Sequence, residues 1–547
     1  MVEVDWRKDA RRRLDQEEFD LLVVGGGATG AAVARDAATR GLRVALCERG
    51  DFACQTSSRS SRLIHGGLRY LQHGDFRLVF EALRERRFLL QNAPHLCRPI
   101  EFFYPAYVGR FPSAAVLALG VGLYDTLALW QSPTRSRRLS SAETLAASPW
   151  LLSEGLQGAQ QYMDCQTDDA RLVLENVLDA AAAGAVVLSR VEVFSPRKAE
   201  HRQAGPMRVV PAVDFDRGER FEIRARLVVN TTGPFCDAFA IGPPRLRPSQ
   251  GVHVVLDSQR LPHHARATVV HSPRDGRLMF VLPAGLRTIV GTTETDWPEN
   301  GPRRPARPED LIRARRRDVE YLLEAANHAF PPACLTPDDV IVAFAGLRPL
   351  VDKGASSGST SREHTIWMDE AGCLNVGGGK LTTMRAMAED IVDRTIKVVR
   401  ERGFKGALRP CQTPNRPLPG GGSIDWPPSE LAPDIKRHLR ETYGSRATQV
   451  LALVKEDASR ARRIVPNLPY IEAEIHHAVR FELVCEVEDV LWRRVPLALF
   501  SKDHGSCAVE TTANILANER GWSPQRRAYS ILQFQTSIAS SLSFNSD

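Results

Sequence analysis

Three glycines, Gly25, Gly27 and Gly30, have the spacing G-x-G-x-x-G in the run GGGATG. They follow FDLLVV, whose unbroken apolar character predicts a buried strand of a parallel sheet, and they open an alanine-rich stretch that predicts a helix. Glycines at these positions let the backbone turn tightly and approach a pyrophosphate, which the helix N-terminus then binds through its N–H groups and dipole. Glu48 ends the next apolar strand, at the distance expected for an acid that binds ribose hydroxyls. Strand, glycine turn, helix, strand and acid, in this order, predict a dinucleotide site.

A second glycine turn, GGGKLTT at 377–383, lies far downstream and opens another predicted helix. In enzymes that bind FAD on an N-terminal unit of this kind, the chain returns late to close over the isoalloxazine ring. A helix N-terminus aimed at the flavin pyrimidine stabilises negative charge on the reduced ring. A glycine turn at each end of a long chain therefore favours one FAD over one NAD.

Lys380 stands inside this second turn and is one of only nine lysines among 72 basic residues. A lysine at a helix N-terminus opposes the helix dipole, which disfavours a purely structural role. We therefore predict that Lys380 is a site residue. The arginines cannot be ranked by residue type alone, and we expect most of them to be solvated at the surface.

Strand-like and helical segments alternate along most of the chain. Strands are predicted at 186–193, 225–233, 287–294 and 373–379, and helices at 168–183, 308–329 and 381–402. The alternation predicts an α/β fold, with antiparallel sheet around 205–295. Two Pro-rich breaks, at 298–308 and 410–428, interrupt it, and the chain after the second break is helical in pattern.

These breaks divide the chain into an N-terminal arm (1–18), an oxidoreductase region (19–409), a linker (410–428) and a C-terminal helical domain (429–547). Within the oxidoreductase region, we expect the FAD domain at about 19–85, 155–240 and 365–409. We expect an inserted substrate domain with a mixed sheet at about 86–154 and 241–364.

The composition of the 547 residues is that of a globular protein, with 43% hydrophobic and 25% charged residues and a net charge of +7. This charge is spread over the whole chain, and the sequence has no motif typical of nucleic-acid-binding domains, so nucleic acid is not expected as a partner.

The ten cysteines form no CxxC pair and no Cys/His cluster, which predicts reduced thiols and no metal site. The run at 113–131 reaches membrane-spanning length, but Asp125 inside it favours a buried helix. The N-terminal residues lack the apolar segment of a secretory signal.

The run TSSRSSRLIHGGLRYL at 56–71 is too specific to arise from composition. It resembles the signature of the FAD-dependent glycerol-3-phosphate dehydrogenases, the respiratory, quinone-linked family. Further matches follow in order between about residues 19 and 500: DDARLVLEN (168–176), NTTGPF (230–235), GLRPL (346–350), GGGKLTT (377–383) and LWRR (491–494). D-amino-acid and sarcosine-type oxidases share the glycine turn but not the first block.

The chain departs from the family pattern at Arg62, Thr231, Phe235 and Glu294, where the family usually has Lys, Ala, Trp and Asp. Because Glu294 is one methylene longer than Asp, the resemblance carries over least at that corner. The fold that the resemblance implies is α/β: an FAD-binding Rossmann-type domain with an inserted mixed-sheet substrate domain, like those of glutathione reductase and D-amino-acid oxidase, plus a C-terminal α-helical domain.

The resemblance also implies roles for single residues. Arg69 and Arg348 lie in the motifs that resemble the substrate-binding segments, and a guanidinium fork suits a phosphate dianion. His253 resembles the active-site histidine, and an imidazole suits proton abstraction. The catalytic residues expected are Arg348, His253 and Lys380, and the substrate-binding residues are Arg69, Tyr70, Arg348 and Lys380. The FAD-binding residues expected are Gly25, Gly27, Gly30, Glu48, Ser57, Ser58, Ser61, His65, Gly66, Gly233, Gly378, Gly379, Leu381 and Thr382.

The implied activity is oxidation of sn-glycerol 3-phosphate to dihydroxyacetone phosphate, with hydride transfer from C2 to flavin N5 and electrons passed to membrane quinone. The resemblance implies a peripheral protein on the cytoplasmic face of the cell membrane, for which the basic segments 7–13 and 303–317 are docking candidates. A homodimer is compatible with the sequence. The alternatives that stay open are a glycerol-3-phosphate oxidase that uses O2 and a non-catalytic flavoprotein relative.

Overall fold

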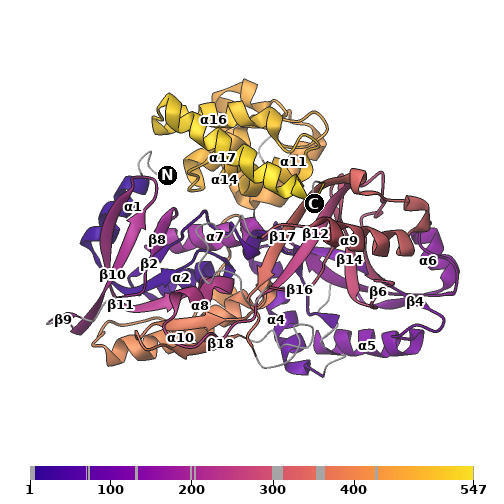
Figure 1. The fold of residues 1–547 in the computed structure, drawn as a ribbon, viewed down its shortest axis with the longest axis horizontal. Coiled ribbons are helices and arrows are strands. Elements are labelled where there is room, and N and C mark those ends of the chain that lie inside the picture. The colour runs from indigo at the N-terminus through magenta and orange to yellow at the C-terminus, as the bar shows by residue number, and fades with distance from the viewer. Residues whose placement is uncertain are drawn as a thin grey trace.

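The computed structural model describes the following residues: 6–68, 71, 74–129, 134–196, 200–202, 205–297, 312–352, 364–423, 426 and 429–545. Within them the chain forms two large sheets side by side and a helical C-terminal domain that lies over both (Figure 1). Arg69 and Tyr70, and residues 303–311 of the second basic segment, lie outside the described residues.

The first sheet has the strand order β18-β19-β11-β1-β2-β7, and β10 joins β8 and β9 to β11. Its strands are β1 (Glu18–Val24), β2 (Val44–Cys47), β7 (Val186–Leu188), β8 (Val191–Val193), β9 (Glu200–Arg202), β10 (Gly205–Asp214), β11 (Glu219–Asn230), β18 (Thr365–Met368) and β19 (Leu374–Gly377). β1 runs parallel to both β2 and β11, and its side chains are buried from Phe19 onward. The apolar run FDLLVV is thus a central strand, as predicted.

Helices cover this sheet: α2 (Ala28–Arg40), α7 (Asp169–Ala182), α8 (Cys236–Phe239) and α10 (Met384–Glu401). α2 is almost fully buried and packs against both α7 and α10, which explains its many alanines. The N-terminal arm forms a further helix, α1 (Trp6–Gln16), whose Arg7 and Arg11 are buried. Arg7 pairs with Asp214 and, at 3.1 Å, with Asp216. The docking role expected for 7–13 is therefore wrong for Arg7 and Arg11, because these two side chains hold α1 against the sheet.

The second sheet has the order β16-β12-β15-β14-β13-β4-β6-β3, with β17 paired to β12 and β5 to β6. Its strands are β3 (Leu63–Ile64), β4 (Arg98–Tyr107), β5 (Arg137–Leu139), β6 (Leu156–Gln166), β12 (Ser249–Asp257), β13 (Ala267–His271), β14 (Leu278–Ala284), β15 (Arg287–Gly291), β16 (Thr295–Asp296) and β17 (Val340–Arg348). β3 and β6 come from segments that we assigned to the FAD domain. They belong to this sheet instead, because β6 pairs with β4 over nearly its whole length.

The helices of the second domain are α4 (Phe76–Asn92), α5 (Ala114–Leu127), α6 (Ser141–Ala147) and α9 (Arg316–Ala329). α9 begins at Arg316, later than expected, because Arg315 is still extended. The apolar run at 113–131 forms α5, but one side of this helix is exposed, with Leu119 at 76%. The expectation of a buried helix is therefore only half right. Among the described residues, no helix is both long and apolar enough to cross a membrane.

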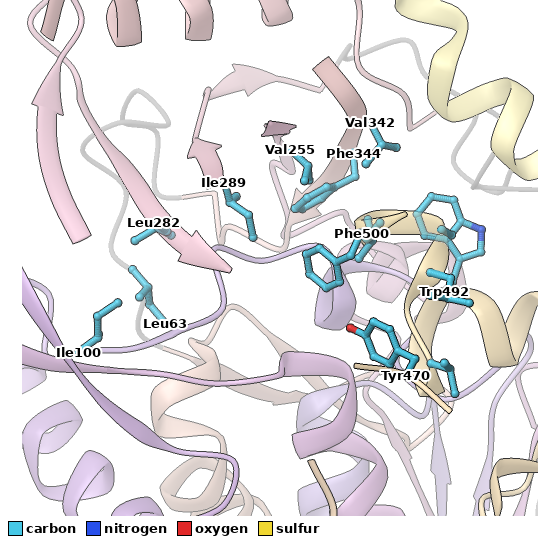
Figure 2. Packing of buried hydrophobic residues seen from close by; sticks show 14 of the residues in the cluster. Leu63, Ile100, Val255, Leu282, Ile289, Val342, Phe344, Tyr470, Trp492 and Phe500 are labelled. Atoms are coloured by element: carbon cyan, nitrogen blue, oxygen red, sulfur yellow. The ribbon is translucent and has the colours of Figure 1, made fainter. Parts of the chain in front are cut away.

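The C-terminal domain is helical: α11 (Pro433–Tyr443), α12 (Ala447–Glu456), α13 (Glu472–Phe481), α14 (Val487–Asp489), α15 (Leu497–Phe500), α16 (Ser506–Arg520) and α17 (Pro524–Leu542). A π-helical turn at Val490–Arg494 follows α14. Figure 2 shows Trp492 and Phe500 of this domain beside Val342 and Phe344 of β17, within one continuous hydrophobic core. The C-terminal domain thus shares a core with the second sheet, on the side of the molecule opposite α5 (Figure 1).

Candidate active site

The first glycine turn joins β1 to α2, and its backbone leaves no room for larger residues. Gly25 has a φ of +103°, and a Cβ on it would lie 2.7 Å from the carbonyl oxygen of Thr231. A Cβ on Gly30 would lie 1.9 Å from the carbonyl oxygen of Gly25. The turn is therefore a bare cradle of peptide groups at the N-terminus of α2, as a bound pyrophosphate requires.

The carboxylate of Glu48 closes this cradle at the end of β2. It accepts hydrogen bonds from the backbone N–H of Gly26 (2.6 Å) and of Gly50 (2.7 Å). Burial raises the pKa of Glu48, although the two N–H groups oppose that shift. The side chain is thus fixed at the mouth of the glycine turn, where the sequence predicts the ribose-binding acid.

A cavity of about 1250 Å³ extends from the glycine turn to the second sheet. Most of the described residues that the sequence predicts for the site line it: Gly25, Gly27, Glu48, Ser57, Ser61, His65, Gly233, His253, Arg348, Gly378, Gly379, Lys380 and Leu381. One continuous space therefore joins the dinucleotide cradle to the residues expected to bind and oxidise a substrate.

Four predicted FAD-binding residues support the wall of the cavity and do not line it. Gly30 packs against Gly25, and the buried Ser58 hydroxyl faces the carbonyl of Gln55 at 3.4 Å. Gly66 donates its N–H to the hydroxyl of Tyr124 (2.7 Å), and Thr382 accepts one from the backbone of His65 (3.2 Å). A sequence motif marks a whole loop, and it does not separate the residues facing the ligand from those behind it.

Arg348 ends β17 and turns its guanidinium into the cavity. Its Nη2 donates to Thr292 Oγ1 (2.9 Å) and to the carbonyl oxygen of Thr293 (3.1 Å). A Cβ on Gly251, in the neighbouring strand β12, would lie 2.5 Å from Nη2. Gly251 therefore leaves the space that the guanidinium occupies, and the two threonines fix its direction. Neither threonine was predicted, although both directly precede Glu294, one of the positions at which the chain departs from the family pattern.

Lys380 lies in the second glycine turn, between β19 and α10. Gly378 and Gly379 have φ of +79° and +106°, and Lys380 Nζ donates to the carbonyl oxygen of His65 at 2.5 Å. The hydroxyl of Thr382 also reaches this carbonyl, at 3.3 Å. The second glycine turn is therefore tied to the loop that carries the family signature, and it places an ammonium group on the cavity wall.

His253, on β12, is buried and lines the same cavity. Its ring stacks on Phe344 at a centroid distance of 5.0 Å, and its Nε2 lies 2.8 Å from Ser61 Oγ. A Cβ on Gly291 would lie 2.2 Å from the ring, so only glycine fits behind it. Burial, with the nearby charges of Arg348 and Arg62, lowers the pKa of His253 to about 3. The imidazole is therefore neutral at physiological pH and able to accept a proton.

A buried polar network supports the loop at 65–67. The carboxylate of Asp164 accepts from Arg86 Nη1 (2.6 Å) and from the hydroxyl of Tyr124 (2.8 Å), which in turn holds the N–H of Gly66. Burial raises the pKa of Asp164, and Arg86 and Tyr124 oppose the shift. Sequence reasoning missed this network because its members come from three distant segments.

The cavity opens at an apolar rim formed by α4, α5 and the loop before α5. Its residues are both exposed and part of the cavity lining, and they are Phe76, Phe111, Val116, Leu119 and Leu123. Phe111 is 73% exposed and Leu119 76%. So many exposed large apolar side chains in one place indicate a binding surface.

The cavity is also lined by side chains of the C-terminal domain, namely Glu486, Glu488, Arg526, Tyr529 and Gln533.

Glu294, where the family usually has Asp, pairs with Arg277 at 2.6 Å and does not line the cavity. Among the described residues no group of His, Cys, Asp and Glu side chains could hold a metal ion.

Comparisons with known proteins cover nearly the whole chain. The family described as FAD dependent oxidoreductase matches residues 20–394, and the C-terminal domain of alpha-glycerophosphate oxidase matches residues 411–527. The chain is 37% identical over 540 residues to a mitochondrial glycerol-3-phosphate dehydrogenase of Mesocricetus auratus, covering 93% of this chain and 72% of that protein. It is 32% identical over 547 residues to the aerobic glycerol-3-phosphate dehydrogenase of Staphylococcus aureus, covering 96% and 95%. The solved structure of the glycerol-3-phosphate dehydrogenase from Bacillus halodurans, complexed with FAD, is similar with a TM-score of 0.78 at 28% identity, covering 100% and 99%.

Proposed function

The chain belongs to the family of FAD-dependent glycerol-3-phosphate dehydrogenases, and we propose that it oxidises sn-glycerol 3-phosphate to dihydroxyacetone phosphate and passes the electrons to a membrane quinone. The observation that carries the proposal is the single cavity that joins the glycine cradle to Arg348, Lys380 and His253. A dinucleotide cradle, two cations and a neutral imidazole are the groups that this oxidation needs.

When bound, FAD would supply the hydride acceptor of the reaction, N5 of its flavin. The residues that would hold it are those around the two glycine turns, with Gly25 and Gly27 at the pyrophosphate and Glu48 at the ribose. The N–H of Ala28 donates to Ser57 Oγ (2.9 Å), which ties the loop at 56–61 to the start of α2. The cradle fits the cofactor because its glycines exclude side chains where the pyrophosphate must approach.

Arg348 and Lys380 provide the positive charge that a phosphate dianion requires, and the resemblance adds Arg69. A guanidinium donates parallel hydrogen bonds to two phosphate oxygens, while an ammonium acts as a point charge. Because Thr292 and Thr293 hold one edge of the Arg348 guanidinium, its direction is set before substrate arrives. The phosphate, and with it the substrate, would thereby be held in one orientation in the cavity.

His253 takes the proton of the C2 hydroxyl in this proposal. Its Nε2 lies 2.8 Å from Ser61 Oγ, and both residues line the cavity. Burial is the main cause of the low pKa of the imidazole, and the charge of Arg348 lowers it further. A phosphate dianion beside Arg348 would offset that second contribution, so the imidazole would become a stronger base when substrate is bound.

We place quinone and the membrane surface at the apolar rim. The rim is continuous with the cavity and lies on α4 and α5, so an isoprenoid quinone or acyl chains can contact it without crossing the polar part of the site. Burial of these side chains would stabilise docking by about 25 cal/mol for each Å² covered. Residues 316 and 317, from the second predicted docking segment, begin α9, where Arg316 pairs with Glu320 at 2.9 Å.

Steady-state turnover tests the acceptor. Purified protein with sn-glycerol 3-phosphate is assayed with a short-chain quinone under argon, and with air-saturated buffer without quinone. We expect quinone reduction and dihydroxyacetone phosphate formation, with little oxygen consumption. Turnover with oxygen alone, accompanied by hydrogen peroxide, would show an oxidase.

A further inference from the structure

The LWRR segment at 491–494 has an unusual environment for two adjacent arginines. It lies in the π-helical turn after α14, and Trp492, Arg493 and Arg494 are all buried. Guanidinium groups are rarely buried unless they are paired, so their partners define what the turn does.

Both arginines share one partner, Asp51, a buried carboxylate of the FAD domain, and each has a further partner within the C-terminal domain: Asp489 for Arg493 (2.9 Å) and the carbonyl oxygen of Glu482 for Arg494 (3.0 Å). Arg493 Nε donates to Asp51 Oδ2 at 2.5 Å, and Arg494 Nη2 donates to Oδ1 at 2.9 Å. Asp51 is three residues beyond Glu48, in the turn that closes the glycine cradle. The C-terminal domain therefore holds the turn that carries the ribose-binding carboxylate.

A second buried ion pair crosses the domains at the same turn. Asp489, two residues before Leu491, pairs with Arg190 at 2.5 Å, and the N–H of Arg190 donates to the carbonyl oxygen of Gly50 at 3.0 Å. Burial alone would raise the pKa of Asp489, but Arg190, Arg493 and Arg494 lower it to about 2. The carboxylate is thus charged at all physiological pH values, and it links the C-terminal domain to the backbone of Gly50.

Trp492 of the same segment contacts a second FAD-binding loop. The Arg59 guanidinium lies 4.5 Å from the centroid of the indole ring, and the indole Nε1 donates to Ser537 Oγ of α17 at 2.9 Å. Burial and the charge of Arg493 lower the pKa of Arg59 to about 10, so it remains a cation that can stack on the ring. Arg59 belongs to the loop at 56–61, in which Ser57 Oγ accepts a hydrogen bond from the N–H of Ala28 at the start of α2.

We infer that the LWRR segment is a bracket of the C-terminal domain that positions both FAD-binding loops, 48–51 and 56–61, and that FAD binding and docking of this segment against the two loops stabilise each other. If Asp51 loses its charge, both buried guanidinium groups lose the carboxylate that they share, and the turn at 48–51 loses its ion pairs to the C-terminal domain, although Arg493 keeps Asp489. By thermodynamic linkage, the factor by which the docked segment raises FAD affinity equals the factor by which bound FAD favours docking of the segment. The inference rests on the proposed position of the FAD ribose beside Glu48.

Two matched variants of the full chain test the inference. D51N removes the carboxylate under the bracket. E175Q removes another buried carboxylate of the FAD domain that pairs with the C-terminal domain, through Arg446 Nη1 at 3.0 Å, but Glu175 lies on α7 and does not line the cavity. After FAD is stripped with high salt and acid, FAD is titrated back into each protein, and its affinity is read from quenching of flavin fluorescence.

We expect D51N to raise the dissociation constant of FAD by about tenfold or more, the size typical of lost support behind a ligand site, and E175Q to change it less than about twofold. FAD should also raise the Tm of E175Q as much as that of the wild type, and raise the Tm of D51N less. Equal weakening in both variants would mean that the bracket acts only as a general domain contact, and unchanged FAD affinity in D51N would also overturn the inference.

R494K is a second variant for the case in which D51N does not fold. Lysine keeps the positive charge but lacks the planar guanidinium that donates to both oxygens of Asp51. We therefore expect the dissociation constant of FAD to rise less than in D51N, and the FAD-induced shift in Tm to be smaller than in the wild type. Wild-type FAD affinity in R494K together with wild-type FAD protection would contradict the bracket. Neither readout depends on the substrate, so a failure of the proposed reaction would leave this test intact.

Discussion

Arg348 lines the cavity, and its Nη2 donates to Thr292 and to the carbonyl oxygen of Thr293, which fixes the direction of the guanidinium. R348K keeps the charge but cannot reproduce this geometry. Because hydrogen bonds to charged groups contribute about 1.5–3 kcal/mol each, we expect the KM for sn-glycerol 3-phosphate to rise at least about tenfold.

Steady-state kinetics with saturating FAD and quinone measures this change. The matched control is R247K, because Arg247 forms a half-exposed ion pair with Asp296 at 2.6 Å and does not line the cavity. We expect R247K to keep the wild-type KM. A wild-type KM in R348K would remove Arg348 from the phosphate site.

The buried, neutral state of His253 makes stability depend on pH. The pKa of this group is about 3 in the folded protein and about 6.5 in an unfolded chain, so between these values the unfolded state binds more protons. The free energy of unfolding therefore falls as pH drops below about 6.5, and His253 accounts for about 2 kcal/mol of that loss at pH 5.

Urea unfolding at pH 7.5 and pH 5 of the wild type and of H253Q measures this contribution. We expect the loss on acidification to be smaller in H253Q by about the stated amount. A control at the exposed His264, H264Q, should behave as the wild type does. Equal acid sensitivity of wild type and H253Q would contradict a neutral buried imidazole.

Arginine shows the limit of reading residue types alone. We expected most arginines to be solvated, yet many are buried in ion pairs, among them Arg35 with Asp179, Arg86 with Asp164 and Arg171 with Glu482. The type of a residue alone does not show whether the fold places a carboxylate beside it. The motifs did identify Arg348 and Lys380, which line the cavity.

At the scale of elements, α4, α5 and the loop before α5 form both an exposed surface of the protein and part of the cavity wall. Leu119 of α5 and Phe111 of the loop are exposed there, and both also line the cavity. We expect the double variant F111E/L119E to bind less to vesicles of phosphatidylglycerol and phosphatidylethanolamine, and to lose quinone turnover relative to turnover with a water-soluble dye, because charged side chains resist transfer into lipid.

Vesicle co-sedimentation and the ratio of quinone to dye turnover measure these effects. L532E is the matched control, since Leu532 is 57% exposed on α17, does not line the cavity and belongs to the C-terminal domain, which lies on the side of the molecule opposite α5 (Figure 1). It should leave both measurements unchanged. Loss of vesicle binding in L532E, with retention in the double variant, would place the docking surface on the C-terminal domain.

The sequence predicted the elements whose signals are local. FDLLVV, the glycine run and the alanine-rich stretch became β1, the turn and α2, and GGGKLTT became the second turn before α10. β3 and β6 were assigned to the other domain because nothing in their own residues shows that their partner is β4. The exposed side of α5 was missed because an apolar run looks the same whether it faces a core or a membrane.

At the scale of the whole molecule, the cavity exists because two sheets and a C-terminal domain meet around it. Asp51 and Arg493 are 442 residues apart in the chain, and no local pattern predicts their contact. The LWRR motif could be seen in the sequence, but its role became clear only when the fold placed it against Asp51. The shared core around Trp492 and Phe500 further indicates that the C-terminal domain is part of the enzyme's scaffold (Figure 2).

Anaerobic titration of the FAD-loaded protein with sn-glycerol 3-phosphate tests the central claim most directly. We predict that the flavin absorbance near 450 nm bleaches, about one dihydroxyacetone phosphate forming per FAD, while glycerol at the same concentration leaves the absorbance unchanged because it lacks the phosphate that Arg348 and Lys380 bind. Flavin absorbance that persists with sn-glycerol 3-phosphate, in protein shown to be folded and loaded with FAD, would contradict the dehydrogenase reading.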